Sequence, residues 1–93
     1  MSKYSRMIKN GIKQTGRTLT AIFLELHLSG IKVSQSYLSL LQNGKAGPAS
    51  DEVNRALAKV LGLDETELLV AAYQDKVPDD VLRELVRRAS IAS

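Results

Sequence analysis

The sequence predicts an all-α protein with six short helices and one small core. Apolar residues recur at three- and four-residue spacing in several segments, which is the period of an amphipathic helix. Glycines separate these segments at Gly16, Gly30, Gly44 and Gly62. No stretch shows a convincing strand pattern. Ninety-three residues with a hydrophobic fraction of 44% are enough for one compact domain.

The composition argues against several classes of function. The chain has no cysteine, which excludes disulfides, thiolate metal sites and cysteine nucleophiles and fits a reducing compartment. No apolar run approaches the roughly 20 residues that cross a bilayer, and the start lacks a signal-peptide pattern, so we expect a soluble cytoplasmic protein without membrane contact. His27 is the single histidine, and no carboxylates cluster with it. We therefore expect no metal ion, no cofactor and no enzyme activity.

Positive charge is concentrated in the first half of the chain. Residues 1–50 contain seven Lys/Arg and one acid, Glu25, whereas residues 51–93 contain six Lys/Arg and nine acids. A basic half beside an acidic half indicates one surface that faces a polyanion and another that faces solvent or a partner. The alternative is ordinary charged helix surfaces, but the ratio of seven to one favours nucleic acid or another polyanion.

The first two helices are expected over residues 4–15 and 18–28. Either of two threonines, Thr18 or Thr20, serves as the N-cap of the second helix. Two further leucines, Leu24 and Leu28, widen the apolar arc of that helix, so the register of the helix stays open. The favoured core residues are Met7, Ile8 and Ile12 in the first helix and Leu19, Ile22, Phe23 and Leu26 in the second.

The third helix, residues 34–43, has clear ends and a polar face. Ser34 suits the N-cap position, because its hydroxyl accepts a hydrogen bond from the free N–H groups of the first turn. Gly44 suits the left-handed position after the helix. Only Leu38 and Leu41 share an inward face. The opposite face carries short hydrogen-bonding groups without a carboxylate: Gln35, Ser36, Ser39 and Asn43. Such a helix within a basic half indicates a helix suited to a DNA groove.

Three more helices follow a loop at residues 45–49. Ser50 caps the fourth, and Asp64 opens the fifth with a capping-box-like start. Their expected core residues are Val53, Ala56, Leu57, Val60, Leu61, Leu68, Leu69 and Ala72. The sixth helix follows Pro78, so we expect a main domain at residues 1–76 and a C-terminal helix at residues 77–93. Its apolar stripe either pairs two copies of the chain or caps the core of its own domain: Val81, Leu82, Leu85, Val86 and Ala89.

The second and third helices form a helix-turn-helix pattern, with a glycine in the turn and a polar free face on the later helix. The chain resembles the lambda-repressor/Cro (Xre-type) helix-turn-helix proteins of bacteria, their phages and mobile elements. Residues 33–45, V-S-Q-S-Y-L-S-L-L-Q-N-G-K, are close to the family's V-S-x-S-Y-I-S-x-I-E-x-G-K, and residues 57–64 resemble its L-A-x-x-L-G-V-s. The resemblance runs from about Leu19 to Leu69. It implies a lambda-repressor-like bundle of five helices, to which the sixth helix is added.

The resemblance also implies roles for residues of the third helix and its flanks. Base edges in the major groove would be read by Gln35, Ser36, Ser39 and Leu40. A glutamine amide is able to pair with two atoms of adenine. Leu40 departs from the polar residue usual in the family, and it either packs on a thymine methyl group or turns into the core. The implied phosphate clamp is Asn43, the Gly44 N–H and Lys45, with Ser34 and Tyr37 as further phosphate contacts.

Three alternatives stay open at this point. Tyr37 is either a phosphate contact or a packing residue at the rim of the core. The turn from Leu26 to Ser34 is longer than the family's short L-G-V-S, so we expect a lengthened helix or turn. Lys32 within that turn either contacts the DNA backbone or is simply solvated.

The sequence therefore predicts a sequence-specific regulator of transcription, most simply a repressor of a phage or mobile element. It would bind double-stranded DNA as a homodimer in the bacterial cytoplasm, at the nucleoid, because one short helix contacts too few base pairs. Dimerisation is assigned to Val81, Leu82, Leu85 and Val86. A protein antirepressor or another regulator is a further possible partner. The second hypothesis is a protein-binding module on the same scaffold, such as an antitoxin or an adaptor.

Overall fold

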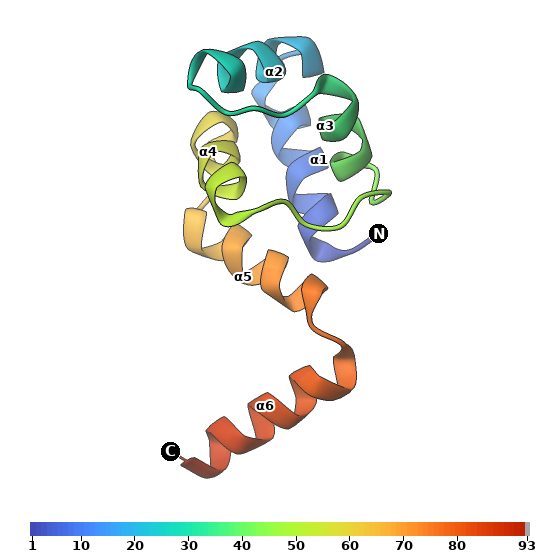
Figure 1. Cartoon of the computed structure of the whole chain (residues 1–93), viewed down its shortest axis with the longest axis vertical. Coiled ribbons are helices and arrows are strands. Elements are labelled where there is room, and N and C mark those ends of the chain that lie inside the picture. The colour runs from blue at the N-terminus through green and yellow to red at the C-terminus, as the bar shows by residue number, and fades with distance from the viewer. Residues whose placement is uncertain (93) are drawn as a thin grey trace.

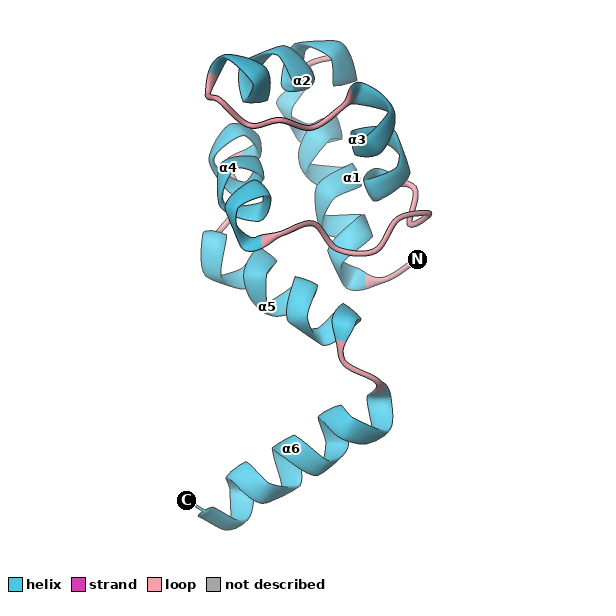
Figure 2. Cartoon of the chain, viewed as in Figure 1, coloured by secondary structure: helices cyan, strands magenta, loops and turns pink. Residues whose placement is uncertain are grey.

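The computed structural model describes the backbone of residues 1–92 and the side chains of residues 1–89; residue 93 of the predicted C-terminal segment lies outside the described residues. Its six helices are α1 (Lys3–Thr15), α2 (Leu19–Leu28), α3 (Gln35–Gln42), α4 (Asp51–Leu61), α5 (Glu65–Lys76) and α6 (Asp79–Ala92). Residues 1–92 contain no strand (Figure 2). The prediction of an all-α protein is confirmed.

Helices α1 to α5 pack into a compact globule, and α6 extends away from it (Figure 1). The α1 helix lies centrally and contacts α3, α4 and α5, while α2 contacts α3 and α4. The large side chains that are fully buried all come from these five helices: Tyr4, Ile8, Ile22, Leu26, Leu38, Leu41, Asn54, Leu57 and Leu68. No helix within residues 1–92 combines the length and the apolar character needed to span a membrane.

Side-chain caps set the start of five helices. The caps are Ser2, Thr18, Ser34, Ser50 and Asp64, and each accepts a hydrogen bond from the backbone N–H three residues later. Each cap therefore satisfies one of the N–H groups that a helix start leaves without a partner. Of the two threonines at the start of α2, Thr18 is the cap. Gly16 and Gly62 end α1 and α4 in the left-handed conformation.

Burial decides the register of α2. Ile22 and Leu26 are fully buried, whereas Leu24 is 50% exposed and Leu28 is 86% exposed. The favoured core set of this helix is therefore confirmed in register, with Phe23 partly buried beside it. The two outer leucines widened the apparent apolar arc because the helix is apolar on nearly every side.

The C-terminal helix does not cap the core of its own domain. Val81, Leu85 and Val86 are 46%, 54% and 58% exposed, and Leu82 is only partly buried. The interpretation that this stripe covers the domain's own core is therefore wrong.

A buried hydrogen-bond network connects α1, α4 and the loop between α3 and α4. The Tyr4 hydroxyl donates to Asn54 Oδ1 at 2.5 Å and accepts from the Ala49 N–H at 3.2 Å. Asn54 Nδ2 donates to the Ala49 carbonyl at 3.0 Å. Both side chains are fully buried, so every polar group of the network depends on its protein partners. Neither residue is predicted to belong to the core from the sequence pattern.

We expect Asn54→Ala to lower the free energy of unfolding by about 1–3 kcal/mol. The substitution leaves the Tyr4 hydroxyl without an acceptor and the Ala49 carbonyl without its amide donor, inside a region that excludes water. Urea denaturation followed by circular dichroism measures this loss. The control is Asn10→Ala on the exposed side of α1, and equal stability of the two variants would contradict the structural role of the network.

Because Tyr4 is buried, the free energy of unfolding falls at high pH. Burial is the main cause that raises the pKa of Tyr4 from 10.0 to about 12, against the hydrogen bond donated by the Ala49 N–H, which lowers it. Below pH 10 both the folded and the unfolded chain carry a neutral Tyr4, and its contribution is fully present. Between pH 10 and pH 12 only the unfolded chain ionises, so on the order of 2–3 kcal/mol is lost. Denaturation at a series of pH values should show this loss in the native chain and not in Tyr4→Phe; parallel pH profiles would contradict it.

Candidate nucleic-acid interface

The α3 helix is fixed to the core along one side, and its other side is open. Leu38 and Leu41 are fully buried, and the Ser34 hydroxyl accepts from the Tyr37 N–H at 3.0 Å at the helix start. Gln35 and Ser36 are exposed in the first turn. A short helix held in this way presents its first-turn side chains outward in a fixed orientation.

The remaining predicted base-reading residues lie on the second turn. Ser39 is partly buried, and Leu40 is 44% exposed. The interpretation that Leu40 turns into the core is therefore wrong. Its side chain is an exposed apolar group next to the polar face, as a contact with a methyl group would require.

A hydrogen bond to Thr20 orients the side chain of Gln35. From the sequence, Thr20 was predicted only as a possible helix cap. The Gln35 Nε2 donates to Thr20 Oγ1, in the first turn of α2, at 2.9 Å. This bond uses one of the two amide N–H groups and leaves the carbonyl oxygen and the second N–H unused. One donor and one acceptor side by side are what the adenine edge in the major groove requires.

The turn between α2 and α3 is long but packed. It comprises residues 29–34, since α2 ends at Leu28 and α3 begins at Gln35. Gly30 adopts a φ of 84°, and the Ile31 N–H donates to the Leu26 carbonyl at 3.0 Å. Ile31 and Val33 then pack against the core. This turn is thus held in place by the core, with Lys32 exposed within it.

The predicted phosphate clamp follows α3. Asn43 and Lys45 are exposed. Gly44 has a φ of 70°, and its N–H donates to the Leu41 carbonyl at 3.2 Å. That N–H already has a partner in the chain, so Gly44 contributes the sharp turn that brings its two neighbours to the surface.

Lys9 of α1 lies beside Asn43 at the C-terminal end of α3. This contact was not predicted from the sequence. The Lys9 Nζ lies 3.5 Å from Asn43 Oδ1, and Asn43 Nδ2 donates to the Ser39 carbonyl at 2.9 Å. The two residues are 34 positions apart, so no local spacing connects them. The only signal in the sequence was the basic character of α1, away from its apolar stripe.

Six of the seven Lys/Arg residues in the first half have no acidic partner among the described residues. Glu25, the single acid of residues 1–50, pairs with Arg17. The other six bases make no ion pair with any carboxylate among residues 1–89: Lys3, Arg6, Lys9, Lys13, Lys32 and Lys45. Their charge is therefore available to an anionic partner.

Tyr37 packs against the core and is partly buried, which favours the rim-packing interpretation over a phosphate contact. Ser34 is exposed, although its hydroxyl is occupied by the Tyr37 N–H. The residues predicted for dimerisation lie on α6, which extends away from the globule that contains α3 (Figure 1).

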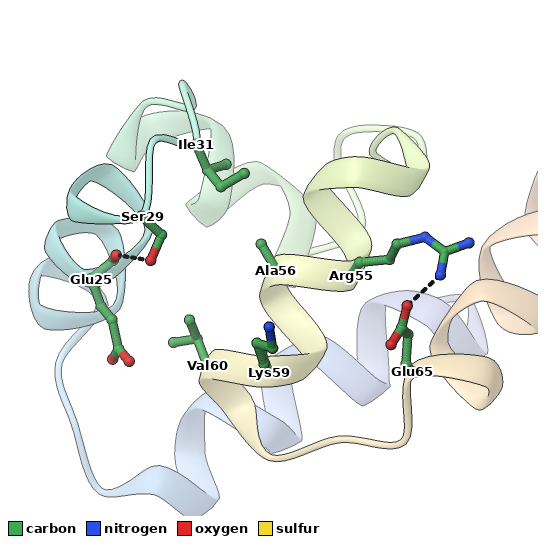
Figure 3. Close-up of a pocket in the computed structure, with 8 residues that line it drawn as sticks. All are labelled: Glu25, Ser29, Ile31, Arg55, Ala56, Lys59, Val60 and Glu65. Atoms are coloured by element: carbon green, nitrogen blue, oxygen red, sulfur yellow. Dashed lines mark hydrogen bonds and ion pairs between the residues drawn. The ribbon is translucent and has the colours of Figure 1, made fainter.

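A separate cavity of about 450 Å³ lies between α2 and α4 (Figure 3). It is lined by Glu25, Ser29, Ile31, Arg55, Ala56, Lys59, Val60 and Glu65. Arg55 pairs with Glu65, and the Glu25 carboxylate pairs with Arg17, which does not line the cavity. Most charged groups of this cavity thus have partners within the chain. Among the described residues no group of three or more His, Asp or Glu side chains is placed to hold a metal ion.

Comparisons with family models, with curated proteins and with solved structures find no match for this chain. The assignment of a role to this surface consequently depends on its own geometry and charge.

We expect Gly44→Ala to lower the free energy of unfolding by about 1–2 kcal/mol, because a residue with a Cβ atom is strained at this φ. The new Cβ would also lie 3.1 Å from Met1 Cγ. Gly47→Ala is the matched control, since nothing lies within 4 Å of its Cβ position and its φ is not in the left-handed region. Urea denaturation measures both, and a loss in Gly47→Ala as large as in Gly44→Ala would contradict this account.

Proposed function

We propose that this protein is a sequence-specific regulator of transcription that binds double-stranded DNA through α3. In this proposal it is a lambda-repressor/Cro-like helix-turn-helix protein and acts as a repressor of a phage or mobile element. Gln35 and Ser36 contact base edges in the major groove, with Ser39 and Leu40 on the following turn. Lys9, Asn43 and Lys45 contact the phosphate backbone.

One observation carries this proposal: a short, firmly anchored helix presents polar groups without carboxylates, and cations without an acidic partner lie at its C-terminal end. Leu38 and Leu41 hold the helix, and Thr20 orients the Gln35 amide. Lys9 lies at the far end of the helix beside Asn43. Phosphate contacts at the end of a helix fix its register on the duplex, and base contacts along its exposed side supply specificity.

The protein would act as a homodimer. An eight-residue helix contacts only a few base pairs, and two copies at half-sites about one helical turn apart multiply the specificity. Regulation would then depend on concentration, on competition for the site or on a protein antirepressor.

A selection of bound sequences from random duplex DNA tests the proposal most directly. We expect a recurring sequence with two-fold symmetric half-sites, and an affinity that falls steeply with salt because several phosphates are contacted. Recovery of no preferred sequence, with equally weak binding to every duplex, would overturn the proposal.

Two substitutions should separate base contacts from phosphate contacts. We expect Gln35→Ala to weaken binding to the selected site by about 1–3 kcal/mol and to relax its preference at one position. Lys45→Ala should weaken binding to all duplexes alike and reduce the salt slope by about 1. Fluorescence anisotropy over a range of salt concentrations measures both effects.

The control for these measurements is Lys59→Ala, which removes a cation from the cavity between α2 and α4. Its salt slope should match that of the native protein. A double variant Gln35→Ala/Lys45→Ala with native affinity and native slope would contradict the assigned interface.

The alternative function is a protein-binding module, such as an antitoxin or adaptor. The observation that favours it is the pair of exposed leucines on the outer side of α2, Leu24 and Leu28. A protein encoded next to this one that co-purifies tightly, and is lost with Leu28→Asp, would support this function.

A further inference from the structure

The cavity between α2 and α4 has an apolar floor that nothing in the chain covers completely. Its volume of about 450 Å³ falls within the range of small-molecule sites, roughly 300–1,000 Å³. Ala56 and Val60 point from α4 towards α2, and Ile31 lies at one end of the opening (Figure 3). These three side chains pack against the core but are only partly buried. A bound molecule would therefore remove further apolar surface from water.

We propose that this cavity binds a small organic carboxylate, with its apolar body on this floor and its carboxylate at Lys59. The proposal concerns a ligand of the globule and goes beyond the proposed binding of DNA by α3.

The charges around the cavity select an anion. Two carboxylates line it, and both are neutralised within the chain. Glu25 pairs with Arg17, and Glu65 pairs with Arg55, whose side chain points away from α2 (Figure 3). Lys59 also lines the cavity and makes no ion pair with any carboxylate in the described part of the chain. A cationic ligand would therefore meet an unpaired lysine and no free carboxylate, whereas an anionic ligand supplies the missing partner.

The single unpaired lysine also favours one negative charge. A phosphate monoester carries nearly two negative charges at neutral pH, and a carboxylate carries one. Lys59 is exposed, so its ion pair contributes only a small part of the affinity. Contact with the apolar floor supplies the rest, and a carboxylate without an apolar body should bind poorly.

The ligand would connect the turn before α3 to α4. Ser29 and Ile31 belong to the segment between α2 and α3, whereas Ala56 and Val60 belong to α4. A molecule that touches both sides adds contacts that exist only while the turn is packed in this position. The Ile31 N–H, which donates to the Leu26 carbonyl at 3.0 Å, should therefore exchange with solvent more slowly in the bound protein.

Three probes with the same apolar body test the choice of ligand: 3-phenylpropionate, 3-phenylpropionamide and 3-phenylpropylamine. They carry a negative charge, no charge and a positive charge. Each is titrated into the full ¹⁵N-labelled chain, and NMR follows the amide signals. We expect shifts centred on Ile31, Ala56 and Val60. The carboxylate should bind about two- to fivefold more tightly than the amide, the size expected of one exposed ion pair, and the amine should bind least. Acetate should cause no shift.

Substitutions separate the charge from the apolar floor. Lys59→Met keeps an apolar stem and removes the charge, so the preference for the carboxylate over the amide should disappear, whereas Lys59→Arg should keep it. Ala56→Leu fills the cavity and should weaken all three probes at least tenfold. The control is Lys13→Ala, which removes an unpaired cation of α1 outside the cavity and should bind the probes as the native chain does.

The proposal would be overturned by an amine that binds as tightly as the carboxylate, or by a preference for the carboxylate that survives Lys59→Met. Native binding by Ala56→Leu, with native circular dichroism, would exclude this cavity as the site. Lys59→Met changes an exposed side chain, so its result does not depend on how well Ala56→Leu folds. No DNA is present in these titrations, and a failure here is therefore distinguishable from a failure of the proposed function.

Discussion

The hydrogen bonds among Tyr4, Ala49 and Asn54 are the constraint on which the arrangement of this protein depends. The core consists mainly of leucine, isoleucine and alanine, and apolar packing of this kind is not directional. The buried network adds direction, because each of its donors and acceptors is paired with one particular group. It connects the start of α1 to α4 at the point where Ser50 caps the helix, and it fixes the end of the loop that leaves α3.

The position of the candidate interface follows from this constraint. An eight-residue helix is too short to be stable alone, so α3 depends on its buried leucines at one side and on the loop at its end. With α1 held by Tyr4, the next exposed turn brings Lys9 beside Asn43. The network is thus one of the contacts that hold α1 where Lys9 reaches Asn43, although it touches neither residue.

Local chemistry allowed most of the fold to be predicted from the sequence. Capping residues and glycines placed the helix ends to within a residue or two, and the spacing of Leu38 and Leu41 identified the exposed side of α3. Contacts between distant residues were not predictable in this way. Tyr4 resembles a rim residue at a helix start, and its partner Asn54 lies fifty positions away in a helix whose stripe is aliphatic. Thr20 and Lys9 were missed for the same reason, because their partners belong to other helices.

The basic surface of the globule and the uncovered apolar face of α6 lie apart. This separation bears on the specificity of the proposed DNA binding. The unpaired cations lie on the globule around α1 and α3, whereas the uncovered apolar face lies on α6. The joint is short: Val77 is extended, with φ −93° and ψ 128°, and the ring of Pro78 fixes its own φ and restricts Val77 before it. A joint of this kind transmits orientation better than a flexible linker would. If two α6 helices pair, the separation of the two α3 helices is therefore restricted, and a restricted separation is what allows a dimer to distinguish half-site spacings on DNA.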